Sequence, residues 1–115
     1  MGKLASEILS DIVIYMKYAR YSPEKKRRET WRELVNRNKR MHIKKYPELK
    51  EEINKAYKLV MEKKILPSMR SMQFGGKSIE VAPNRIYNCA FLPIDDWRTF
   101  GEIMFLLLGG TGVGY

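Results

Sequence analysis

The chain has 115 residues, of which 44% are hydrophobic and 30% are charged. This composition is that of a globular chain of at most one domain, and it excludes the disordered and fibrous classes. The longest strongly apolar stretch, Ile103 to Leu108, is far too short to cross a bilayer, and no continuous hydrophobic secretory signal stands at the N-terminus. We therefore expect a cytoplasmic protein without membrane association.

The positive charge is unevenly distributed. Residues 1–64 carry 18 Lys and Arg against 9 Asp and Glu, whereas residues 65–115 carry 4 of each kind. The sequence therefore predicts two regions, a basic N-terminal helical region over residues 1–64 and a neutral region over residues 65–115.

Three helices are expected in the first region. Apolar residues at a spacing of 3.6 predict a first helix, with an inward stripe formed by Leu4, Ile8, Ile12, Tyr15 and Ala19. Ser22 and Pro23 are typical of an N-cap and a first helical position, so the second helix is expected to begin there and to continue through Asn38. After Pro47 a third stripe is formed by Leu49, Ile53, Ala56, Tyr57 and Val60.

Beyond Pro67 the helical pattern is lost, and glycine and proline predict loops and short strands. The alternation over residues 85–92 predicts a half-buried strand with Cys89 in its middle. Asp95 or Asp96 is expected to cap a last helix that ends at Gly109. Its core-facing residues are expected to be Trp97, Phe100, Met104, Leu107 and Leu108.

Few residues point to chemistry by themselves. Cys89 is the only cysteine, which excludes an internal disulfide, and His42 has no partner at metal-ligand spacing, so no metal site is expected. The glycines between Gly109 and Gly114 follow a helix and lack the Lys-Ser/Thr of a phosphate-binding loop. They predict that the backbone here comes close either to a neighbouring strand or to a ligand, and the spacing does not choose between the two.

The basic run Lys25 to Arg28 has two interpretations. It can be a solvated helical face, because Glu24, Glu29 and Glu33 are interleaved with it, or it can bind phosphates. The second interpretation makes the chain a small basic nucleic-acid-binding module, which is the alternative function.

Three segments carry a family resemblance. Residues 66–71 (LPSMRS), 87–91 (YNCAF) and 109–115 (GGTGVGY) are similar, in order and spacing, to the start of the catalytic barrel in adenosylcobalamin-dependent (class II) ribonucleotide reductases. Residues 18–25 also resemble the N-terminal helices of this family. The resemblance implies an α+β fragment, in which an N-terminal helical unit is followed by the first strand and helix elements of a ten-stranded α/β barrel. The barrel would begin in residues 65–115 and remain incomplete without further polypeptide.

The resemblance also implies an activity and a site. Such enzymes convert ribonucleotides to deoxyribonucleotides by thiyl-radical chemistry, and Cys89 matches one cysteine of their reducing pair. Ser68 and Asn88 match positions that line the substrate pocket, while Thr111 and Gly112 match the turn that approaches the nucleotide.

Several partners follow from the same resemblance. The chain is expected to be inactive without the remainder of the reductase, which would bind most of the adenosylcobalamin, and to depend on an external thiol reductant such as thioredoxin. No specific nucleic acid is expected as a partner. Oxygen-dependent relatives share the cysteine and glycine motifs, but many begin with an additional ATP-binding domain for which there is no room before Ser68. The short helical start therefore favours the cobalamin type.

Overall fold

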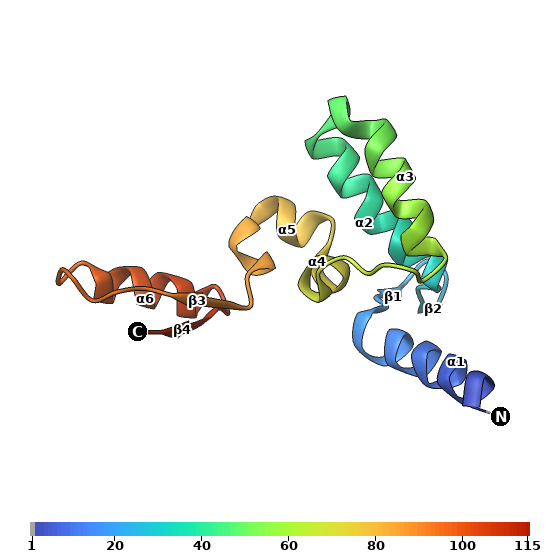
Figure 1. The fold of residues 1–115 in the computed structure, drawn as a ribbon, viewed down its shortest axis with the longest axis horizontal. Helices are drawn as coiled ribbons and strands as arrows, with labels where there is room; N and C mark the ends of the chain where they lie inside the picture. The colour runs from blue at the N-terminus through green and yellow to red at the C-terminus, as the bar shows by residue number, and fades with distance from the viewer. Residues whose placement is uncertain (1) are drawn as a thin grey trace.

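The computed structural model describes residues 2–115, and the chain is elongated (Figure 1). A helical hairpin and the N-terminal helix lie at one end and a strand–helix–strand unit at the other, with two short helices between them. The radius of gyration is 17.2 Å, whereas a compact domain of this length has about 13 Å. The helices and strands of the first region are α1 (Gly2–Val13), a π-helical turn (Ile14–Tyr18), β1 (Tyr21–Ser22), β2 (Arg27–Arg28), α2 (Trp31–Lys45), a 3-10 turn (Pro47–Leu49) and α3 (Lys50–Met61).

The predicted start of the second helix is wrong. Ser22 is paired with Arg27 in the small antiparallel β1–β2 ladder, and α2 begins only at Trp31. The Thr30 side chain accepts the Glu33 backbone N–H, and the Glu33 carboxylate accepts the Thr30 N–H. This reciprocal capping box satisfies two otherwise unpaired donors, which Ser22 and Pro23 do not achieve.

The core lies between α2, α3 and the segment that follows them. Its buried side chains are Leu34, Val35, Tyr57, Val60 and Met72. The third predicted helix is confirmed, although only part of its stripe is inside, since Leu49 remains exposed at the start of the helix.

The predicted inward face of the first helix is wrong in a different way. Ala19 is buried, but Leu4, Ile8, Ile12 and Tyr15 are all exposed. The helix itself forms as its periodicity predicts, yet α1 extends away from the hairpin and none of its residues is buried (Figure 1). Amphipathic periodicity therefore identified the element but not the surface that it covers.

Residues 65–88 contain helices where loops and strands were expected. They form α4 (Met69–Phe74), α5 (Lys77–Val81) and a 3-10 turn (Pro83–Ile86). Helices of five or six residues are too short to show a periodic apolar stripe, so the prediction of loops failed there.

The last part of the chain is a parallel β–α–β unit. It consists of β3 (Cys89–Phe91), α6 (Thr99–Leu108) and β4 (Gly112–Gly114), with Cys89 aligned to Gly112 and Phe91 to Gly114. The strand is confirmed but shorter than predicted, so Cys89 begins it rather than lying in its middle. Gly109 is the C-cap as expected, whereas the apolar side chains of α6 face solvent instead of a core. Within residues 2–115 no helix combines the length and apolarity that a membrane crossing requires.

Candidate redox cysteine site

Cys89 is a free, exposed thiol at the first residue of β3. Tyr87 and Phe91, on the same face by alternation, are exposed as well. Ala90, on the opposite face, is half-buried, which agrees with the half-buried alternation expected for this strand. The thiol is therefore held on a hydrogen-bonded strand and remains open to a reactant.

The glycine turn brings β4 beside Cys89. Gly110 has a φ of +86°, a left-handed conformation that glycine adopts without strain, and its N–H donates to the Leu107 carbonyl at 2.9 Å. The Thr111 N–H donates to Leu106 and the Gly112 N–H donates to Asn88. Gly112 is paired with Cys89 of the neighbouring strand, but a Cβ added to Gly112 would make only an ordinary contact, 3.7 Å from the Asn88 carbonyl oxygen. The predicted close approach is therefore not found at Gly112, and its backbone N–H is engaged within the fold.

Thr111 lies inside the turn rather than on its surface. Its side chain is only 1% exposed, and its Oγ1 donates to the Tyr87 carbonyl at 3.5 Å. Thr111 therefore ties the turn before β4 to the segment before Cys89.

Asn88 and Gly110 both bind the side chain of Arg70, which was not among the predicted site residues. Nη2 of Arg70, in α4, donates to Asn88 Oδ1 at 3.0 Å and to the Gly110 carbonyl at 3.3 Å. The signal available in the sequence was its place in the LPSMRS segment, two residues after Ser68. Arginine is suited to such bridging because its guanidinium presents several donors in a rigid plane.

Ser68 is the N-cap residue of α4 and is exposed. Its carbonyl accepts the Met72 N–H at 3.0 Å, while its side chain makes no capping bond. The structure thus joins Asn88, Thr111 and Gly112 around the start of β3, and it connects Ser68 to them only through α4.

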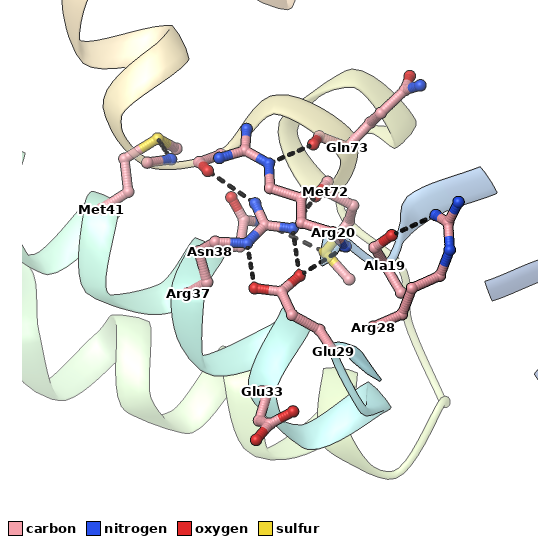
Figure 2. A network of polar contacts seen from close by, with 12 residues as sticks. Ala19, Arg20, Arg28, Glu29, Glu33, Arg37, Asn38, Met41, Met72 and Gln73 are labelled. Atoms are coloured by element: carbon pink, nitrogen blue, oxygen red, sulfur yellow. Dashed lines mark hydrogen bonds and ion pairs between the residues drawn. The ribbon is translucent and has the colours of Figure 1, made fainter. Parts of the chain in front are cut away.

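The other side of α4 is bound to the N-terminal region (Figure 2). The Arg37 guanidinium forms a bidentate ion pair with Glu29, at 2.8 and 3.0 Å, and also donates to the Met72 and Gly75 carbonyls. The fully buried Asn38 donates to Tyr57 Oη at 2.9 Å and accepts from Ser71 Oγ at 2.8 Å. These bonds fix the helix that carries Arg70.

The basic run is partly engaged within the chain. Lys25 and Arg27 both pair with Glu33, and Arg28 donates to the Ala19 carbonyl. Hydrogen bonds from Arg27, followed by Lys25, hold the pKa of the Glu33 carboxyl far below its usual range. Lys26 occupies the tip of the β1–β2 turn with a φ of 51°.

The described residues form no cluster suited to a metal. Among residues 2–115 no three His, Cys, Asp or Glu side chains come together as possible ligands. His42 is half-buried, and its Nε2 lies 3.4 Å from Ser71 Oγ. Burial lowers the pKa of this imidazole.

Comparison of the chain with protein-family models, curated proteins and solved structures found no match.

Proposed function

We propose that this chain forms the N-terminal part of a ribonucleotide reductase and contributes one cysteine of its reducing pair. The observation that carries the proposal is the parallel β3–α6–β4 unit, with an exposed Cys89 aligned to the glycine strand. It joins two of the three segments that carry the family resemblance, and Arg70 joins the third to them.

The parallel pair is suited to completion by further strands. Parallel sheets occur almost only with both faces covered, and a sheet of two parallel strands buries very little. Helix α6 is apolar around most of its surface, which is typical of a helix buried in a larger protein. Its exposed apolar side chains are Phe100, Met104, Phe105, Leu107 and Leu108.

The accessible surface supports the same proposal. The chain exposes 8856 Å², whereas a compact monomer of 13.6 kDa exposes roughly 6,600 Å². Additional polypeptide that covers α6 and extends the β3–β4 sheet would bury this excess.

The proposed chemistry requires two thiols. Replacement of a ribose hydroxyl by hydrogen consumes two electrons and two protons and releases water. The Cys89 thiol and a second cysteine thiol supply both and become one disulfide, which an external dithiol then reduces. Since Cys89 is the only cysteine here, the second thiol belongs to the additional polypeptide.

Among residues 2–115 no group of three His, Cys, Asp or Glu side chains comes together that could hold the cobalt of adenosylcobalamin. His42, the only histidine, lies in the hairpin network with its Nε2 3.4 Å from Ser71 Oγ. In the proposed assembly the additional polypeptide would hold most of the cofactor.

The test is complementation. A cobalamin-dependent reductase from which the matching N-terminal segment has been removed is mixed with this chain, adenosylcobalamin and a dithiol, and deoxynucleotide formation is measured. We expect turnover with the wild-type chain and none with Cys89→Ser, while exchange of hydrogen between cofactor and solvent survives in the variant.

A matched control is Ser10→Ala, a small polar change on α1, far along the chain from Cys89. Equal turnover for the wild type and Cys89→Ser would end the redox assignment. Absence of both association and turnover with the wild-type chain would contradict the proposal as a whole.

A further inference from the structure

Helix α4 has only six residues, too few to be stable by itself in water, so its position depends on its neighbours. Two arginines of the N-terminal region bind carbonyls at its C-terminal end. Arg37 donates to Met72 and Gly75, and Arg20 Nε donates to Gln73 at 3.3 Å (Figure 2). Cations favour this end of a helix because the last carbonyls are unpaired and carry partial negative charge.

Arg70, near the N-terminal end of α4, contacts the cysteine site through its side chain. Arg70 is half-buried, with its guanidinium carbon 5.6 Å from the centre of the Phe74 ring, which restricts the side chain. One nitrogen of this arginine reaches both the residue before Cys89 and the glycine two residues before Gly112. The two segments are the starts of the two paired strands.

We infer that Arg70 is a positioning residue, which sets the place of Cys89 by holding the starts of β3 and β4 together and to α4. Through α4, the Arg20 and Arg37 bonds extend this support to the α2–α3 hairpin. The N-terminal region therefore helps to position Cys89. This positioning rests on the proposed function only for the chemical role of Cys89, because the bridge itself belongs to this chain.

The experiment uses the full chain and residue-resolved amide hydrogen exchange. The reporters are the Gly112 N–H, bonded to Asn88, and the Leu92 N–H, bonded to Gly114. Arg70→Met is expected to accelerate exchange at both amides about tenfold, because it removes the two hydrogen bonds from the Arg70 guanidinium that oppose local opening. Exchange at Val35 and Val60 in the hairpin core should not change.

Two further variants sharpen the result. Arg70→Lys keeps a donor and the charge but not the planar fork, so its exchange rates should fall between those of the wild type and Arg70→Met. Arg85→Met removes a different arginine, which is exposed, and should leave both reporter amides as in the wild type. A nitroxide attached to Cys89 should give narrower spectral lines in Arg70→Met, since the strand that carries it is less constrained.

Unchanged exchange at Gly112 and Leu92 in Arg70→Met would overturn the inference. Equal acceleration at the hairpin amides would also overturn it, since Arg70 would then be a general stabiliser. Both measurements are independent of reductase activity. A failed complementation with a positive exchange result therefore removes the proposed function and leaves the bridge in place.

Discussion

Asn38 is the residue on which most of the interior polar network depends. It is fully buried in α2. Its amide nitrogen donates to Tyr57 Oη and Met72 Sδ, and its amide oxygen accepts from Ser71 Oγ. A buried amide is tolerated only when its donors and acceptors form hydrogen bonds. The hydroxyl groups of Tyr57 and Ser71 are in turn bonded to Asn38.

Asn38→Leu is therefore expected to lower the free energy of unfolding by about 2 kcal/mol, because the Tyr57 and Ser71 hydroxyls lose buried partners. Urea denaturation followed by circular dichroism measures this change. Asn54→Leu, at an exposed position of α3, is the matched control and should stay within about 0.5 kcal/mol of the wild type. A loss no larger than that of the control would show that the network contributes little to stability.

His42 gives the fold a dependence on pH near neutrality. Burial lowers its pKa in the folded state below the ordinary value of 6.5, so the unfolded chain takes up a proton first as the pH falls. Stability is then complete above pH 6.5 and declines as the pH falls from there through the folded-state pKa.

We expect the free energy of unfolding to decrease between pH 7.5 and 5.5 in the wild type and to decrease less in His42→Gln. Urea titrations at several pH values in this window measure it. Glu33 does not interfere, because its lowered pKa affects stability only at more acidic pH. Parallel pH profiles for the two proteins would contradict the assignment to His42.

At the scale of elements, the start of α2 shows how one local motif redirects the chain. The capping box of Thr30 and Glu33 begins the helix, and the same Glu33 carboxylate receives Lys25 and Arg27 from the preceding turn. The Glu33 carboxylate therefore stabilises both the start of α2 and the β1–β2 turn.

Thr30→Ala removes the side-chain acceptor of the Glu33 N–H and is expected to cost about 1 kcal/mol of stability. Thr30→Ser keeps the hydroxyl and should remain close to the wild type. Thermal unfolding of the three proteins compares them directly. Equal melting of Thr30→Ala and Thr30→Ser would mean that the Glu33 carboxylate alone maintains the helix start.

At the scale of the whole molecule, the closed core of the hairpin contrasts with α1 and α6, which both expose their apolar stripes. The β3–α6–β4 end presents apolar side chains such as Phe105, 64% exposed, and Leu108, 82% exposed. Exposed apolar patches of this kind mark surfaces for association.

Phe105→Lys combined with Leu108→Lys should leave the melting temperature of the chain nearly unchanged, because neither side chain is buried. The same double variant should weaken association with the truncated reductase about a hundredfold, since two apolar side chains would no longer be buried there. Isothermal titration calorimetry measures the affinity. Leu4→Lys combined with Ile8→Lys on α1 is the control of equal charge, and equal weakening by both pairs would show that α6 is not the docking element.

The sequence by itself determined the elements whose signal is local. The hairpin helices, the strand at Cys89, the helix that follows it and its stop at Gly109 were all predicted from spacing or from the glycine stop. The predicted start of that last helix was wrong, because its N-cap is Arg98 and not Asp95 or Asp96. The short helices α4 and α5 escaped because five or six residues show no period. The prediction of a helix start at Ser22-Pro23 was wrong because the capping box lies at Thr30 and Glu33. There each side chain accepts the backbone N–H of the other residue.

Only the tertiary structure decided which surfaces meet. The apolar stripes of α1 and α6 were expected to face a core, but both remain exposed. Whether a stripe is buried depends on which other elements pack against it, and the spacing of residues in the sequence does not show that. Arg70 reaches Asn88 and Gly110 across 18 and 40 residues of chain. Contacts at such separations arise from packing of whole elements, which is why the residues around Cys89 could be suggested from the sequence while the arginine that joins them could not.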